Sequence, residues 1–315
     1  MAGDLLTLCA FNVENLFISL EYSDGHNFEI LTEEEWRDLA LPQLRKRQKP
    51  LAKTWGLAET ILDIAPDVLM LTEVGGPDSL ENFNRHFLGG RYEPLFVDGN
   101  SSRAIDLAFL VRKGLHFRSE ARSNRDLPVE VLTWEGKQMA KFSRDIAELR
   151  LYDESGLRLI LLLVHLKSMI TTEQGYRGKN VRTAEAVALA DYYGKLRAAH
   201  PNTPIVLGGD FNANLESQEL ELLARTDLID FHNVLDTPPE ERVTYIHFDH
   251  AGTARPETLD YLLISPQLRD RIEKSRSFVY RYKGPYGITE ERPNSLQSRY
   301  RLPSDHYPQV LTLRL

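Results

Sequence analysis

The chain has 315 residues, a formal net charge of -8 and 42% hydrophobic residues. These values are typical of a soluble globular protein with enough apolar residues for a sizeable core. The acidic balance argues against nonspecific coating of nucleic acid, because such binding needs many lysine and arginine contacts to phosphate. No apolar run approaches the ~20 residues that span a bilayer, and the N-terminus does not resemble an export signal. We therefore take the cytoplasm as the default location, which leaves secretion open.

The N-terminal half predicts alternating strands and helices. A strand is expected over Leu5–Asn12, and Thr32–Ile64 reads as helical, divided by Pro42 and Pro50. The run DVLMLTEV after Pro66 predicts a buried strand, and Ser79–Phe87 predicts a short helix. Four further strands are expected, over Ile105–Arg112, Phe117–Arg122, Phe142–Tyr152 and Leu157–Leu166.

The C-terminal half continues in the same way. Arg177–Ala199 has helical spacing of its apolar residues, and three strands complete the set, at Pro204–Gly209, Leu259–Ser265 and Gln309–Leu315. The stretches Arg242–Thr258 and Tyr280–Ser304 read as long loops, which in compact domains are usually functional or mobile. Strands dominate both halves without a repeat or linker. We expect two packed sheets with helices outside, in one domain over residues 1–315.

Polar residues recur where the predicted apolar strands end. They are Asn12, Glu73, His165, Asp210 and Asp260, followed by the pair Asp305 and His306. Any one of them could cap a turn. The ends of strands on one edge of a sheet lie close together, however. Polar residues at several strand ends therefore indicate a functional site.

Two of these positions have a partner two residues away. Glu14 follows Asn12 and Asn212 follows Asp210, so each pair faces one side if its strand continues. Carboxylates beside amides suit a hard cation with water, or a phosphate beside an attacking water. The single cysteine, Cys9, excludes an internal disulfide and the usual thiolate zinc sites.

The order of the motifs resembles that of the endonuclease/exonuclease/phosphatase superfamily, and most closely its bacterial nuclease-like branch. The matching segments are FNVENL at 11–16, LTEV at 71–74, VHLKS at 164–168, GGDFNAN at 208–214, LDYLLIS at 259–265 and SDHYP at 304–308. The resemblance implies a four-layer α/β sandwich of two mainly antiparallel sheets flanked by helices. It also implies hydrolysis of a phosphate ester with Mg²⁺ or Mn²⁺.

The resemblance further assigns roles residue by residue. Glu73 would be the principal metal ligand, with Asn12 and Glu14 nearby and Asp305 a further ligand. Asp210 would activate water, Asn212 would bind the phosphate, and Asp260 would hold His306 against the developing charge. His165 would assist the leaving oxygen, with Asp106 as its acid partner.

Basic residues indicate where an anionic substrate binds. Lys167 lies within the VHLKS motif, Arg177 and Arg182 follow it, and Arg103 precedes Asp106 by three residues. The Val279–Arg301 segment interleaves arginines and lysine with tyrosines, a pattern suited to phosphates and stacked bases. The LTEV motif is followed by Gly75 and Gly76, where deoxyribonucleases place a basic residue.

Three functions remain open from the sequence. A nuclease acting on DNA or RNA is the first hypothesis. A phosphatase or phosphodiesterase for a small molecule or lipid headgroup is the alternative, favoured by the acidic charge and by the glycines after LTEV. A non-catalytic binding module is a distant third, because every core catalytic position holds a competent residue. The sequence identifies no protein partner.

Overall fold

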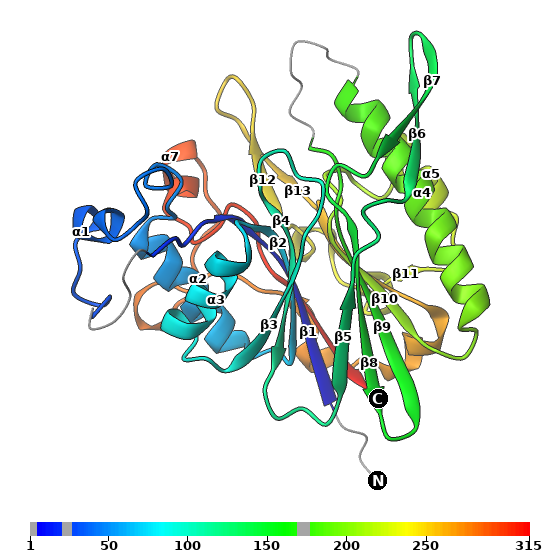
Figure 1. The fold of residues 1–315 in the computed structure, drawn as a ribbon, viewed down its shortest axis with the longest axis horizontal. Coiled ribbons are helices and arrows are strands. Elements are labelled where there is room, and N and C mark those ends of the chain that lie inside the picture. Colours follow the sequence, from blue (N-terminus) through cyan, green and yellow to red (C-terminus); the bar gives the residue numbers. More distant parts are fainter. Residues whose placement is uncertain (1–4, 21–26, 169–176) are drawn as a thin grey trace.

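Two six-stranded sheets lie face to face in the computed structural model, which describes residues 5–20, 27–168 and 177–315. Helices cover the outer surfaces of both sheets, so the expected four-layer sandwich is confirmed (Figure 1). The first sheet has the order β15-β16-β1-β2-β4-β3. Its strands are β1 (Leu5–Leu16), β2 (Val68–Val74), β3 (Tyr92–Val97), β4 (Asp106–Arg112), β15 (Phe278–Val279) and β16 (Gln309–Arg314).

The second sheet has the order β11-β14-β10-β9-β8-β5. Its strands are β5 (Arg118–Arg122), β8 (Ile146–Asp153), β9 (Gly156–His165), β10 (Ile205–Asp210), β11 (Ile229–Asp230) and β14 (Asp260–Ile264). The pairs β1–β2 and β9–β10 are parallel, and the other pairings described within the two sheets are antiparallel. The predominance of antiparallel pairing is therefore confirmed.

The sheets are joined by a shared apolar core. Leu8 and Phe109 of the first sheet lie in one buried cluster with Leu161 and Val206 of the second. A sheet with two apolar faces must bury both, and the remaining faces are covered by helices. The sandwich fixes the relative positions of strand ends that are far apart in the sequence.

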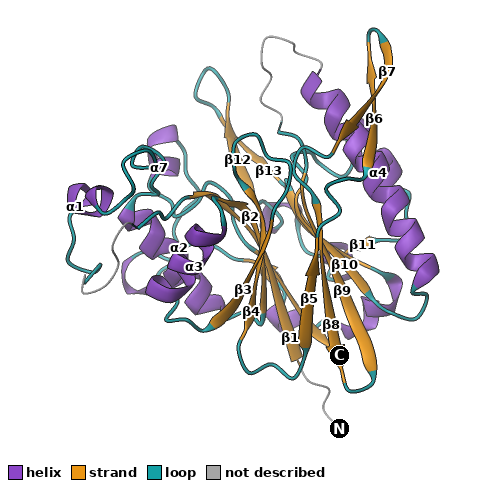
Figure 2. Cartoon of the chain, viewed as in Figure 1, coloured by secondary structure: helices purple, strands orange, loops and turns teal. Residues whose placement is uncertain are grey.

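Helices form the outer layers (Figure 2). The first sheet is covered by α1 (Glu33–Asp38), α2 (Leu51–Ile64) and α3 (Pro77–Phe87), and the second by α4 (Arg177–Ala199) and α5 (Glu221–Ala224). The short helices α6 (Phe231–Val234) and α7 (Leu296–Tyr300) and five 3-10 segments at 218–220, 239–241, 266–271, 274–276 and 285–287 complete the set. None of the described helices is long and apolar enough to cross a membrane.

The predicted helical region at 32–64 is divided as its prolines suggested. Thr32 caps α1 in a reciprocal box with Glu35, and Pro50 immediately precedes α2. The Glu33 carboxylate accepts hydrogen bonds from the backbone N–H groups of Leu51 (3.2 Å) and Ala52 (3.1 Å). One acidic residue therefore fixes the start of α2 against α1 by satisfying N–H groups that a helix start leaves free.

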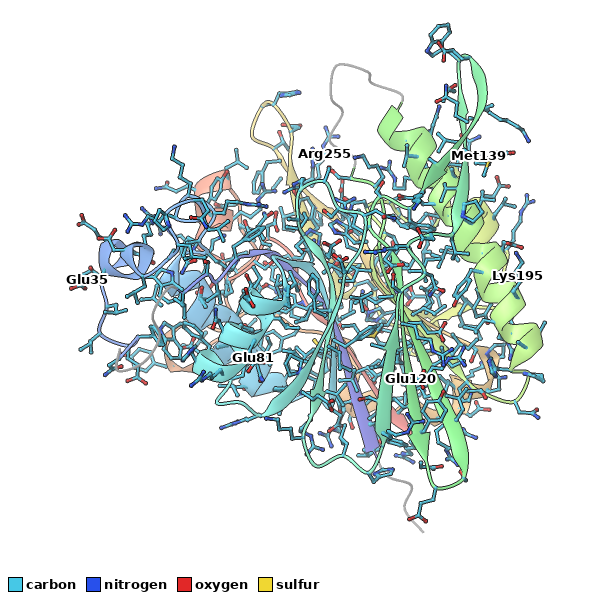
Figure 3. All side chains as sticks on the ribbon, viewed as in Figure 1. Glu35, Glu81, Glu120, Met139, Lys195 and Arg255 are labelled. Atoms are coloured by element: carbon cyan, nitrogen blue, oxygen red, sulfur yellow. The ribbon has the colours of Figure 1, made fainter. Side chains whose placement is uncertain are left out.

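The structure corrects the strand list in five places. The prediction missed β3, the two-residue strands β11 and β15, and the hairpin β6–β7 (Pro128–Thr133 and Gly136–Lys141), and it read the hairpin β12–β13 (Tyr245–Phe248 and Ala254–Glu257) as loop. In the first hairpin only Val129 and Val131 are buried, so its alternating signal is short. Both hairpins stand out from the same end of the molecule, with Met139 and Arg255 labelled on them (Figure 3).

Candidate active site

The strand ends that carry polar residues converge on one pocket at the edge of the sandwich. Its volume is about 320 Å³. It is lined by Glu14, Asn15, Glu73, Arg103, His165, Ser168, Asp210, Asn212, Tyr245, His247, Leu259, Asp305 and His306. The sequence-predicted residues Asn12 and Asp260 lie buried beside it, each 2% exposed. Residues from both sheets thus form one candidate site, as the strand-end argument predicted.

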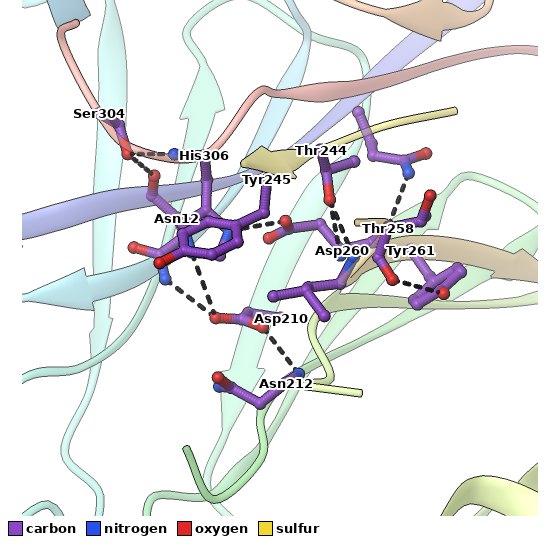
Figure 4. Close-up of polar contacts among 12 residues, drawn as sticks. Asn12, Asp210, Asn212, Thr244, Tyr245, Thr258, Asp260, Tyr261, Ser304 and His306 are labelled. Atoms are coloured by element: carbon purple, nitrogen blue, oxygen red, sulfur yellow. Dashed lines mark hydrogen bonds and ion pairs between the residues drawn. The ribbon is translucent and has the colours of Figure 1, made fainter. Parts of the chain in front are cut away.

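A buried histidine–carboxylate pair forms one wall of the site (Figure 4). His306 Nδ1 lies 2.7 Å from Asp260 Oδ2, and Thr244 Oγ1 accepts a hydrogen bond from the Asp260 backbone N–H. Ser304 Oγ accepts from the His306 N–H and donates to the carbonyl of Asn12. Burial alone lowers the pKa of His306, but Asp260 and Asp210 outweigh it and hold that pKa well above the usual value. The imidazole is therefore held cationic.

Asp210 occupies the centre of the site. Asn12 Nδ2 donates to Asp210 Oδ2 at 3.1 Å, and the Asn212 backbone N–H donates to Oδ1 at 2.8 Å. The same Oδ2 atom lies 3.6 Å from His165 Nε2 and 3.9 Å from His306 Nε2. Burial raises the pKa of Asp210 to about 7, which suits a group that exchanges a proton near neutral pH.

His165 is buried between the acids. Its Nε2 lies 3.9 Å from Glu73 Oε1, and its Nδ1 has no hydrogen-bond partner in the described chain. Burial, followed by the charge of Arg144, lowers the pKa of His165 well below the usual value. This second imidazole is therefore neutral, in contrast to His306.

Asp106 is not the partner of His165 in this structure. No hydrogen bond between described residues joins them, and Asp106 Oδ1 is itself buried without a partner. Asp106 begins β4 and packs on Gly99, where an added Cβ would lie 2.5 Å from Oδ1. The expected pairing is not formed among the described residues, where the Asp106 carboxylate packs on Gly99 instead.

Three carboxylates line the pocket beside Asp210, namely Glu14, Glu73 and Asp305. Glu73 Oε2 accepts the Asn15 backbone N–H at 3.0 Å, which orients its carboxylate. Burial and then the charge of Asp305 raise the pKa of Glu14. Oxygen donors that repel one another across a pocket fit a hard divalent cation, which would relieve that repulsion.

Glu14 differs from the other two carboxylates because two lysines already neutralise it. Lys53 Nζ lies 2.5 Å from Glu14 Oε2, and the buried Lys49 Nζ lies 3.8 Å from the same atom. Lys49 also donates to the Glu14 backbone carbonyl at 2.8 Å. Among the described residues, Glu73 and Asp305 are not neutralised by lysines in this way and are therefore better placed to bind a cation.

Asp210, Asp260 and His306 also form a group whose candidate ligand atoms all lie within 4.8 Å of one another. The short hydrogen bond between His306 and Asp260 accounts for much of this closeness. A carboxylate that already accepts a histidine proton is a poor metal ligand. We therefore interpret this group as a hydrogen-bonded cluster and not as the principal metal site.

The backbone departs from regular strand geometry at the site. Glu14, Asn15, Glu73 and Asn212 all have positive φ angles, between 47° and 67°. The ladder of β1 with β2 shifts register around Glu14 and Asn15, and the ladder of β2 with β4 shifts around Glu73. The simple alternation expected for Asn12 and Glu14 therefore does not hold, and irregular backbone re-aims the polar side chains instead.

The predicted substrate-binding residues separate into different environments. Arg103 is exposed and lines the pocket, with its Nη2 donating to Asn15 Oδ1 at 3.0 Å. Lys167 is half-buried next to the pocket residue Ser168. The Arg177 side chain lies outside the described residues. Arg182 is only 4% exposed, pairs with Glu219 and donates to the Lys167 carbonyl, so its predicted substrate contact is wrong.

Sequence reasoning missed four residues of the site. Arg144 is buried near Glu73 and Asp210, and Glu185 accepts the backbone N–H groups of Ser143 and Lys167, each at 2.7 Å. Tyr245 and His247, from the segment expected to be loop, line the pocket, and the Tyr245 ring lies 4.8 Å from that of His306. None of the four lies in one of the matched motifs, so the motif series did not point to them.

An α/β sandwich whose strand ends gather carboxylates, amides and a histidine–aspartate pair defines a hydrolase of the phosphoesterase class. The model of the endonuclease/exonuclease/phosphatase family matches residues 10–306, and the chain belongs to this family. Enzymes of this family depend on divalent metals, and the free carboxylates described above fit that requirement. A comparison with curated protein sequences gave no match.

Solved structures share the fold at low sequence identity. Truncated TDP2 from Caenorhabditis elegans superposes with a TM-score of 0.62 at 18% identity, covering 99% of this chain and 98% of that one. TDP2 from D. rerio, complexed with single strand DNA product, gives a TM-score of 0.59 at 15% identity and covers 99% of both chains. A mannosyl-6-phosphatase from Bacteroides thetaiotaomicron gives 0.57 at 16% identity, covering 97% and 98%.

Proposed function

We propose that this protein is a divalent-metal-dependent phosphodiesterase that cleaves a nucleic-acid strand, DNA or RNA. The carrying observation is the position of Asp210 Oδ2, which Asn12 holds within 4 Å of both a neutral and a cationic imidazole. A carboxylate placed in this way can orient a water and accept its proton. The charged His306 can then donate from Nε2 to a phosphate oxygen as negative charge builds.

The remaining residues complete the machinery. Glu73 and Asp305, with Asn12 and Glu14 close by, would hold Mg²⁺ or Mn²⁺, which supplies charge neutralisation at the phosphate oxygens. Asn212 is fixed by its bond to the Leu166 carbonyl at 3.1 Å and keeps a second amide hydrogen for the phosphate. Arg144 adds a buried positive charge behind the acids, and His165 assists the leaving oxygen.

The residues that surround the pocket favour nucleic acid as the substrate. Arg103 provides an exposed guanidinium, which binds phosphate well. Tyr245 places an aromatic ring beside His306, and Arg299 Nη1 donates to its hydroxyl at 2.8 Å. Cationic and aromatic groups at one mouth favour a phosphate backbone with stackable bases. The D. rerio TDP2 structure shows that this fold accommodates single strand DNA product in that protein.

A small phosphate ester is the second candidate substrate. The pocket volume of about 320 Å³ falls within the range of small-ligand sites. The similarity to a mannosyl-6-phosphatase supports the same reading. The two candidates share the catalytic groups and differ only in what the pocket mouth binds.

The test is hydrolysis of supercoiled plasmid, single-stranded DNA and RNA with Mg²⁺, with Mn²⁺ and with EDTA. We expect metal-dependent cleavage of at least one polymer, reduced roughly 10²–10³-fold in His306→Ala. His200→Ala, a change in a histidine next to the end of α4 and outside the pocket, is the matched control and should retain activity. Intact polymers under both metals, together with phosphate release from small esters, would favour the second candidate.

A further inference from the structure

Two arginines, Arg103 and Arg47, contact each other at the rim of the pocket. Arg103 lines the pocket and is bonded to Asn15, and Arg47 Nη2 donates to the backbone carbonyl of Arg103. Both side chains are exposed. Arg47 therefore contacts the pocket residue Arg103 without lining the pocket itself.

Arg47 is held in position by an aromatic platform. Its guanidinium carbon lies 3.8 Å from the centroid of the Phe17 ring, a cation–π contact. Phe17 in turn covers Gly75, where an added Cβ would lie 2.2 Å from the ring. The missing side chain at Gly75 thus makes room for the ring that supports Arg47. The position of the cation is set before any ligand binds.

The basic run that contains Arg47 is only partly neutralised by acidic side chains of the described residues. Between Asp38 and Glu59 the sequence has no acidic residue and five basic ones, at 45, 46, 47, 49 and 53. Arg45 pairs with Asp38, and Lys49 and Lys53 pair with Glu14. Neither Arg47 nor Arg103 has an ion pair with a carboxylate in the described part of the chain. An exposed guanidinium held in place with unused N–H donors is suited to bind an external anion.

We propose that Arg47 forms a second phosphate subsite, which binds a phosphate neighbouring the scissile one while Arg103 serves the pocket rim. The ligand class is a strand of phosphodiesters, because a substrate with a single phosphate cannot occupy both the catalytic pocket and Arg47. The inference rests on the proposed function and deepens it. It also identifies which groups supply the basic contact that Gly75 and Gly76 cannot.

The test compares two substrates in the same Mg²⁺ or Mn²⁺ buffer. One is a single-stranded oligonucleotide, and the other is bis(p-nitrophenyl) phosphate, which has one phosphate. We expect the ratio of kcat/KM for the oligonucleotide to kcat/KM for the small diester to fall about tenfold in Arg47→Ala. Arg45→Ala removes the same charge two residues away, from a side chain paired with Asp38 at 3.2 Å, and should keep the wild-type ratio.

A neutral-phosphate scan locates the subsite on the substrate. Methylphosphonate is placed at each phosphate beside the cleavage position in turn. We expect wild-type cleavage to weaken about tenfold at one flanking position and Arg47→Ala to lose nothing further there. An unchanged ratio in Arg47→Ala, with normal wild-type cleavage, would overturn the subsite alone. Wild-type turnover of the small diester without cleavage of any oligonucleotide would overturn the nucleic-acid function as well.

Discussion

The basic residues around the site fall into two regions that look alike in sequence and differ in structure. On α4, Arg182 is buried, paired with Glu219 and bonded to the Lys167 carbonyl. At the pocket rim, Arg103 and the adjoining Arg47 are exposed and lack a carboxylate partner among the described residues. The first arrangement holds the protein together, and the second leaves charge available for a substrate.

The difference shows how this fold divides its polar groups. The Lys167 peptide is held at both ends by α4, because its N–H donates to Glu185 and its carbonyl accepts from Arg182. His165 lies two residues before it, so α4 fixes the segment that positions an imidazole. We infer that buried charges with fixed partners orient the candidate catalytic residues, whereas exposed charges without a carboxylate partner stay available to bind the ligand.

The largest expected effect belongs to the buried region. Asp260→Asn removes the charge that holds His306 cationic, and we expect kcat to fall roughly 10³-fold. His306 acts in its protonated form and Asp260 raises its pKa. As the pH is raised, the residual activity of the variant should therefore decline at a lower pH than the activity of the wild-type protein. Full pH–rate profiles of both proteins measure this, and an unshifted alkaline limb would contradict the assigned role.

A pair of arginine variants tests the comparison itself. Arg182→Ala leaves Glu219 and the Lys167 carbonyl without their partner, so we expect the free energy of unfolding to fall by ~3 kcal/mol. Arg103→Ala should change that free energy by less than ~0.5 kcal/mol and should lower kcat/KM on a nucleic-acid strand about tenfold. Urea denaturation and steady-state kinetics of both variants give the two readouts. Equal loss of stability in both would remove the distinction between the regions.

The sequence predicted which polar residues gather at the candidate site, because most of them lie at strand ends. Asn12, Glu73, Asp210 and His306 each follow or adjoin an apolar run, and the sandwich brings these ends together. The family resemblance then supplied their roles. The simple alternation along β1 failed because Glu14 and Asn15 adopt positive φ angles, which no periodicity indicates.

The surroundings of the site were harder to predict because they depend on tertiary burial. Arg182 and Arg103 both lie near motifs in the sequence. Only the tertiary packing distinguishes them, because it buries Arg182 against Glu219 and leaves Arg103 exposed at the pocket rim. Glu185 reads as an ordinary helical glutamate, although its buried carboxylate joins two loops. Arg47 lies in a basic run that looks like a solvated surface until Phe17 and Arg103 fix its position.

The most direct test of the proposed action on nucleic acid compares two substrates of the wild-type protein in Mg²⁺. It compares kcat/KM for a short single-stranded oligonucleotide with kcat/KM for a hexose 6-phosphate. We expect the oligonucleotide to be favoured by roughly 10²-fold or more, because it engages the rim arginines as well as the catalytic groups. A ratio that favours the sugar phosphate would contradict the nucleic-acid function while leaving the catalytic cluster intact.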